Sequence, residues 1–326
     1  MSLKSYGFAV GSLRARENLI LKHNDYLSLL SSVSIEELRQ KLYDKGIGVG
    51  ADTDEIPDML RYETKKLWEY IEDIAPDMFY FLPFFYENDF HNLKAILKAI
   101  ITDNSYEQLL ITPSTVDTNL IVRAIKDTRF DILPEFMADT AKEAYELLNK
   151  TGDAQLSDGV IDAKCMYCQL KTADETKNKT IREIIRNTVF FNQIKIALRS
   201  ANANKTSEFL DLTLIESGFI LKKELKLASL SGEERVLELL SGIDSVQGEK
   251  AAELYLKAPW RLEKFVDELN LTKANECMRI TMGIEPIVGY MLIKLNEIKN
   301  IRIIWSGVKT EQKPSYTEER LREIYG

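Results

Sequence analysis

Hydrophobic residues recur along this chain at the spacing of an α-helix. The first stripe lies almost at the start of the sequence and consists of Tyr6, Val10, Leu13 and Ile20, with Glu17 as its single interruption. Positions spaced by three or four residues share one face of a helix. The pattern therefore predicts one long helix over residues 6–20.

Similar stripes follow at residues 60–74, 181–191 and 260–269. No segment alternates with period two for long enough to predict a strand. Glycine (15 residues) and proline (8 residues) are scarce, and these two residues disrupt helix interiors most. Turn-forming residues divide the chain into about fifteen predicted helices. We therefore expect an all-α protein.

A short motif occurs three times, at intervals of roughly one hundred residues, far longer than the unit of a tetratricopeptide or HEAT array. Each copy reads amide, aliphatic, base, followed by mostly aliphatic residues. Its amide and base positions are Asn92 and Lys94, Gln193 and Lys195, and Asn300 and Arg302. The repeat predicts three similar helical subdomains, at residues 1–110, 111–217 and 218–326.

A Ser-x-x-acid sequence precedes each copy, beginning at Ser34, Ser114 and Ser231. In such a capping box the serine oxygen accepts a hydrogen bond from a free backbone N–H at the start of a helix. Each serine is therefore predicted to start a helix.

The bases Lys94, Lys195 and Arg302 have two interpretations. They could line a shared surface related by pseudo-threefold symmetry, as contacts for a partner. They could equally be exposed positions on buried helices, because amphipathic helices place charged residues there in any case. The sequence leaves both interpretations open.

Charge and composition exclude several classes of function. With a net charge of −8, the chain has no long-range attraction for nucleic acid, and no basic run stands out. No apolar segment approaches the roughly 20 residues of a membrane-spanning helix. The N-terminal sequence lacks a secretion signal, and three cysteines do not form a disulfide framework. These features indicate a cytoplasmic protein.

Candidate chemistry is weak throughout the sequence. Cys165 and Cys168 have the spacing of half a zinc site, but no second pair of ligands accompanies them, so buried helix cysteines are the better interpretation. The glycine-rich residues 46–51 lack the strand–turn–helix context of a dinucleotide site and are interpreted as a loop. Neither His23 nor His91 belongs to a Glu-x-x-His pair. We expect no catalytic residue, metal or cofactor, and hence a protein that acts by binding other proteins.

The most distinctive sequences lie at the two ends of the chain, at residues 6–17, 283–290, 297–302 and 318–325. Together they resemble the C subunit of the V/A-type (vacuolar/archaeal-type) rotary ATPases, the counterpart of the d subunit of the eukaryotic V-ATPase. The length and the threefold helical repeat agree with that resemblance.

The resemblance implies a funnel of three similar helical subdomains that performs no chemistry. It implies a peripheral position on the cytoplasmic face of the membrane, where the protein would receive the central stalk and contact the membrane rotor ring. The isolated chain would be a monomer. Transport of H⁺ or Na⁺, and ATP-driven pumping or ATP synthesis, are all compatible with it.

The acid-x-x-Asn pattern of that family is incomplete here. Asp89 precedes Asn92 and Glu297 precedes Asn300, but Phe190 precedes Gln193 in the middle copy. Strict threefold equivalence is therefore not expected. A free-standing helical adaptor for other partners is the alternative function, and an enzyme with a bound metal or cofactor is a third.

Overall fold

The computed structural model describes residues 5–325, which form sixteen α-helices and no strand. The all-α prediction is thus confirmed. The chain divides into two compact units. The first unit combines the residues up to Met78 with those from Leu254 onward, and the second unit is Phe79–Glu253. The division into three subdomains follows the sequence repeat and stays a prediction.

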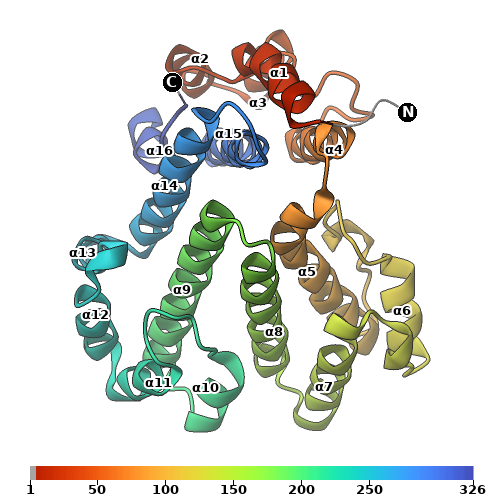
Figure 1. The fold of residues 1–326 in the computed structure, drawn as a ribbon, viewed down its shortest axis with the longest axis vertical. Helices are drawn as coiled ribbons and strands as arrows, with labels where there is room; N and C mark the ends of the chain where they lie inside the picture. The colour runs from red at the N-terminus through yellow and green to blue at the C-terminus, as the bar shows by residue number, and fades with distance from the viewer. Residues whose placement is uncertain (1–4, 326) are drawn as a thin grey trace. The chain divides into compact units, whose positions relative to one another are not determined.

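The first unit is built around one long helix, α15 (Glu285–Lys309), coloured blue in Figure 1. Five consecutive residues of α15, Ile287 to Met291, are buried, as expected of a helix that has neighbours on several sides. The other helices of this unit are α1 (Tyr6–Arg16), α2 (His23–Leu30), α3 (Ile35–Asp44), α4 (Ile56–Ile74), α14 (Pro259–Met278) and α16 (Pro314–Arg320).

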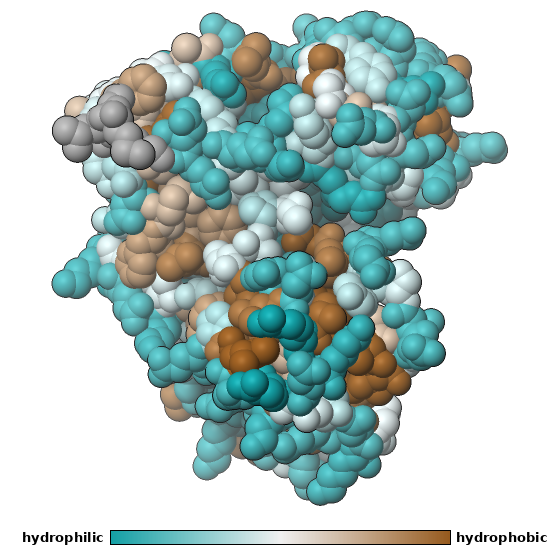
Figure 2. Space-filling view, turned by 90° about the vertical axis from the view of Figure 1, so that its right-hand side faces the viewer, coloured by the Kyte–Doolittle hydropathy of each residue, from teal (hydrophilic) through white to brown (hydrophobic). Residues whose placement is uncertain are grey.

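The second unit has its core where α5 (Leu82–Ile101), α7 (Glu135–Thr151) and α8 (Ala154–Glu175) meet. Its other helices are α6 (Thr118–Lys126), α9 (Lys179–Asn202), α10 (Ser207–Thr213), α11 (Lys222–Ser231) and α12 (Glu233–Ser241), while α13 (Gly248–Lys257) crosses the boundary of the two units. The side that carries α6 shows hydrophobic residues among hydrophilic ones in Figure 2, and Leu109 and Ile111 are exposed residues of the segment before α6.

Several local predictions are confirmed. The stripes at residues 60–74, 181–191 and 260–269 lie in α4, α9 and α14. Ser34 caps α3, because its hydroxyl accepts the Glu37 N–H at 3.1 Å. Residues 46–51 form a turn-rich loop. Cys165 and Cys168 are buried thiols on α8.

Three local predictions are wrong. The first helix ends at Arg16, and Glu17 begins a short 3-10 turn instead of continuing the helix. Ser114 starts no helix, because its hydroxyl donates to Asp89 and α6 is capped by Asp117. Ser231 lies inside the end of α11 and donates back to the Leu227 carbonyl, so α12 begins after Gly232. In the last two cases the hydroxyl bonds to another part of the chain, and a different residue stands at the N-cap of the next helix.

The helices α14 and α15 cross closely at Gly289. A Cβ atom there would lie 2.7 Å from the Ala274 carbonyl oxygen and 2.8 Å from the Cys277 Cβ. Gly11 on α1 is a matched contrast, because an added Cβ would meet no atom within 4 Å.

We predict opposite effects of the same substitution at these two glycines. Gly289→Ala should lower the free energy of unfolding by about 1–3 kcal/mol, because the two helices must move apart. Gly11→Ala should raise it by about 0.5–1 kcal/mol, because alanine favours the helix. Urea unfolding followed by circular dichroism measures both. Equal effects at the two sites would refute the close crossing.

Candidate functional site

The three motif amides lie on the three long helices α5, α9 and α15, and all are fully buried. Asn92 accepts the Ile111 N–H at 2.8 Å and donates to the Ile111 carbonyl at 2.9 Å. Asn300 makes the same pair of bonds with Arg322, at 2.8 and 3.2 Å. A primary amide has one acceptor and one donor side, so it can satisfy both polar groups of one backbone residue.

The middle copy repeats this contact in part. The Gln193 side chain accepts the Ile215 N–H at 2.7 Å, but its NH₂ group faces the Met166 sulfur at 3.2 Å. We call these three contacts the clamps. Each clamp fixes an extended segment of chain that follows the clamping amide by 19 or 22 residues.

The acid that precedes the amide holds a second segment. The Asp89 carboxylate accepts bonds from the Ser114 hydroxyl at 2.6 Å, the Thr115 N–H at 2.7 Å and the Val116 N–H at 3.2 Å. Val116 immediately precedes Asp117, the N-cap of α6. In the first copy, therefore, the motif fixes both the extended segment and the start of the next helix.

In the third copy the second segment comes from the opposite end of the sequence. The Glu297 carboxylate, 2% exposed, accepts the Leu21 N–H at 2.8 Å, and its other oxygen pairs with Lys294. Leu21 immediately precedes Lys22, the N-cap of α2. Leu21 and Val116 thus have equivalent positions, because each directly precedes the N-cap of a helix. In space, α2 stands to the acid of the third copy as α6 stands to the acid of the first.

The segment clamped by Asn300, residues 321–325, is called the strap here. Besides the clamp, Asn296 donates to the Glu323 carbonyl at 3.0 Å, and the Arg322 guanidinium pairs with Asp267 at 2.7 Å. The Tyr325 hydroxyl donates to Glu17. The strap is therefore tied to α14, α15 and the end of α1.

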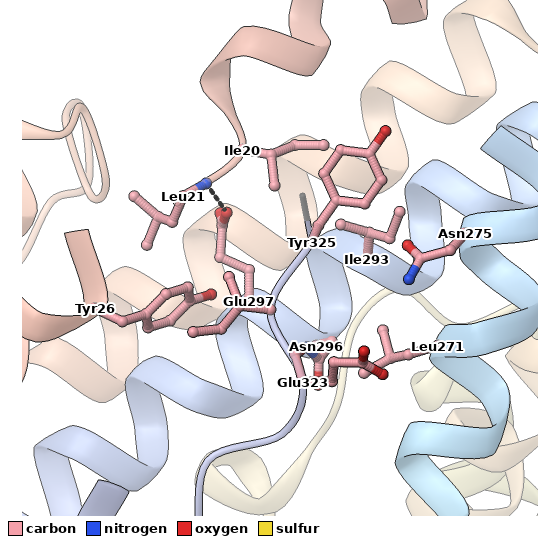
Figure 3. A pocket seen from close by; sticks show the side chains of 11 residues that line it. Ile20, Leu21, Tyr26, Leu271, Asn275, Ile293, Asn296, Glu297, Glu323 and Tyr325 are labelled. Carbon is pink, nitrogen blue, oxygen red and sulfur yellow. Dashed lines mark hydrogen bonds between the residues drawn. The ribbon is translucent and has the colours of Figure 1, made fainter. Parts of the chain in front are cut away.

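Figure 3 shows the cavity that the strap covers, where the Leu21–Glu297 bond and Tyr26, Asn275 and Tyr325 surround a space of 10 Å³. This space accommodates about one water molecule and no organic cofactor. Burial, and next the nearby Glu297 carboxylate, raise the pKa of Tyr26. Its hydroxyl remains neutral at physiological pH, as a structural group would.

The three motif bases have different surroundings. Lys94 pairs with Asp162 of α8 at 2.6 Å and borders a 350 Å³ hollow, together with Lys98, which pairs with Asp158 at 2.5 Å. Lys195 is half-buried and Arg302 is exposed. The structure therefore does not place the three bases in one kind of environment, and their role as partner contacts stays a prediction.

Sequence reasoning identified the amides but missed the backbone segments that they hold. One signal was present, because a leucine directly precedes each clamped residue: Leu110, Leu214 and Leu321. The bond between Glu297 and Leu21 left no comparable signal, because it joins residues from opposite ends of the sequence.

A family model described as ATP synthase (C/AC39) subunit matches residues 9–320. The chain belongs to this family. The resemblance seen in the sequence is thereby confirmed at the level of the family. The C/AC39 family comprises non-catalytic structural subunits of V/A-type ATPases, so this chain is part of a rotary ATPase complex and not itself an enzyme.

Curated relatives of this C/AC39 chain match it over nearly their whole length. The C subunit of the V-type sodium ATPase of Enterococcus hirae is 21% identical, with 96% of this chain and 97% of the relative covered. The C subunit of the A-type ATP synthase of Methanobrevibacter smithii is 22% identical, with 96% and 86% covered. Its counterpart in Methanocaldococcus jannaschii is 25% identical, with 96% and 85% covered. No helix in residues 5–325 combines the length and apolar character needed to span a membrane.

We predict that the clamps stabilise the fold strongly. Asn92→Ala and Asn300→Ala should each lower the free energy of unfolding by about 2–4 kcal/mol, because each leaves a backbone N–H and a carbonyl without partners. Gln193→Ala should cost less, since one backbone bond is lost. Asn18→Ala, at an exposed position, is the control and should change stability by less than about 0.5 kcal/mol. Denaturant unfolding measures the free energy of unfolding of all four variants. Equal values for the three clamp variants and the control would contradict a stabilising role of the clamps.

The stability of the strap should also depend on alkaline pH, through ionisation of the Tyr325 hydroxyl. Burial, and then the hydrogen bond to Glu17, raise the pKa of Tyr325 to about 12. An unfolded tyrosine has a pKa near 10, so the stability that Tyr325 provides is complete below about pH 10 and is lost as the pH rises through the folded value.

Tyrosinate absorbance of the wild type minus that of Tyr325→Phe isolates this group among the 14 tyrosines. A difference titration centred near the raised pKa of about 12 is expected. One centred near the ordinary tyrosine value of about 10 would show that the hydroxyl is free of Glu17.

Proposed function

We propose that this protein is the rotor socket of a V/A-type ATPase, the component that couples the central stalk to the membrane rotor ring. The observation that carries the proposal is the family match over residues 9–320. The relatives named above are C subunits of a sodium ATPase and of ATP synthases, and this chain spans at least 85% of each.

The clamps suit a part that transmits force. A socket performs no chemistry, and its requirement is that torque applied to one helix moves the next helix without unfolding the chain between them. Buried hydrogen bonds hold direction as well as distance. Asn92 and Asn300 supply such bonds between a long helix and a distant segment, which supports a mechanical role.

The proposal includes the arrangement implied by the resemblance. Three similar helical subdomains would form a funnel with pseudo-threefold symmetry on the cytoplasmic face of the membrane, peripheral to it, as counterpart of the eukaryotic d subunit. The partners would be the proteins of the central stalk and the membrane rotor ring, bound through a large interface since torque across a small one would slip. The isolated chain would be monomeric.

The test is purification of the tagged chain from its own cells after gentle solubilisation of the membranes. We expect mass spectrometry to recover the stalk, the ring and the nucleotide-binding subunits with it. Recovery with other partners and without the ring would instead establish a free-standing adaptor.

Coupling is tested in membrane vesicles from cells that lack the chain. ATP hydrolysis by the remaining soluble part should persist, whereas ATP-driven transport should fall to background, measured for H⁺ with a pH-sensitive dye and for Na⁺ with a radioactive tracer. Re-expression of the wild-type chain is the control. Transport that continues without the chain would contradict a socket in the torque path.

A further inference from the structure

A groove of 660 Å³ lies in the first unit between α2 and the strap. One wall is formed by His23, Tyr26, Leu27 and Leu30. These residues stand at positions i, i+3, i+4 and i+7, so a single face of α2 borders the groove. Leu27 is 42% exposed there.

A second hollow of 220 Å³ shares Leu30 with this groove, so the two adjoin at that residue. Val33, which follows α2, borders the second hollow and is 90% exposed. The two hollows thus present exposed apolar side chains, Leu27 and Val33, on either side of the buried Leu30. We call the two hollows with these side chains the docking groove.

A buried hydroxyl without a hydrogen-bond partner in the described part of the chain, that of Ser32, lies beside the second hollow. Ser32 borders the second hollow and is only 7% exposed, and its enclosed hydroxyl oxygen has no hydrogen-bond partner within residues 5–325. A buried polar group without a partner costs about 1–3 kcal/mol. Because the oxygen itself is enclosed, an occupant of the hollow could satisfy it only if the Ser32 side chain turned toward the hollow.

The rim of the docking groove carries uncompensated negative charge. Glu311, Glu318 and Glu323 border it and form no ion pair in the part of the chain that the structure describes. The two bases beside them are already engaged: Lys264 lies 3.7 Å from Glu268, and Arg322 pairs with Asp267. An occupant of complementary charge is therefore basic.

The strap limits how an occupant can bind. An added β-strand would require free backbone groups, but Asn300 bonds both polar backbone groups of Arg322 and Asn296 bonds the Glu323 carbonyl. Recognition through side chains is what remains. An amphipathic helix binds in this way, with apolar anchors in a groove and charged residues at its rim.

We propose that the docking groove receives an amphipathic helix with lysine or arginine on its polar side, contributed by another protein of the complex. Its apolar residues contact Leu27 and Val33, and its bases face Glu318 and Glu323. The identity of the occupant as a neighbouring subunit rests on the proposed function; the basic, helical character rests on the groove alone.

Photo-crosslinking in the assembled complex tests the location. A benzophenone amino acid replaces Val33, and the matched control replaces Val49, another exposed valine of the first unit that borders neither hollow. We expect position 33 alone to crosslink to a lysine- or arginine-rich amphipathic segment of another subunit. No crosslink at position 33, or one to a second copy of this chain, overturns the proposal, and co-purification with the ATPase subunits would leave the proposed function standing.

Binding to the purified full chain tests the chemistry. The probes are two synthetic helical peptides of identical length, one of leucine and lysine and one of leucine and glutamate, and the measurement is fluorescence anisotropy. The lysine peptide should bind at least about tenfold more tightly, and the double substitution Glu318→Lys with Glu323→Lys should reverse that preference.

Val33→Asn should weaken binding of the lysine peptide by about tenfold, whereas Val49→Asn should leave it unchanged. Equal affinity for both peptides, or equal effects of the two valine substitutions, overturns the proposal. Circular dichroism of each variant verifies that the fold is retained.

Discussion

The clamps that join a buried amide to a distant backbone residue determine how this chain is held together. An extended segment between helices has neither a helical hydrogen-bond ladder nor a neighbouring strand, so its buried polar groups need partners elsewhere. Asn92 and Asn300 provide both partners for Ile111 and Arg322. The placement of the following chain therefore depends on one side chain per copy.

The acid of the motif extends this control to the next helix. Asp89 fixes the residue before the N-cap of α6, and Glu297 fixes the residue before the N-cap of α2. Since Leu21 lies far before Glu297 in the sequence, the third copy is completed by the amino-terminal part of the chain. The Leu21–Glu297 bond adds to the hydrophobic cluster that already joins the two ends of the sequence in the first unit. The strap and α2, both held at α15, border the docking groove.

The sequence predicted what depends on local periodicity. The helices α4, α9 and α14 follow from their apolar stripes, and Ser34 caps its helix because its hydroxyl accepts the Glu37 N–H three residues later. The predictions for Ser114 and Ser231 failed because neither residue stands at an N-cap. Ser114 donates to the Asp89 carboxylate and lies three residues before the N-cap Asp117, while Ser231 ends α11 and donates to the Leu227 carbonyl. Asp89 is distant in sequence, so a local motif could not reveal it.

The middle copy shows what the loss of the acid changes. Phe190 stands in place of the carboxylate, and its ring packs against Phe191 and Phe219 with centroids 5.1 and 5.0 Å apart. Aromatic contacts stabilise mainly through the apolar area that they bury and constrain the direction of the chain less tightly. The hydrogen bonds of Asp89 and Glu297 fix both the distance and the direction of their partners. Gln193 also makes a single backbone bond. A socket built from these three copies would be stiff at the first and third joints and more compliant at the second, so its resistance to torque would be asymmetric although its sequence repeat is threefold.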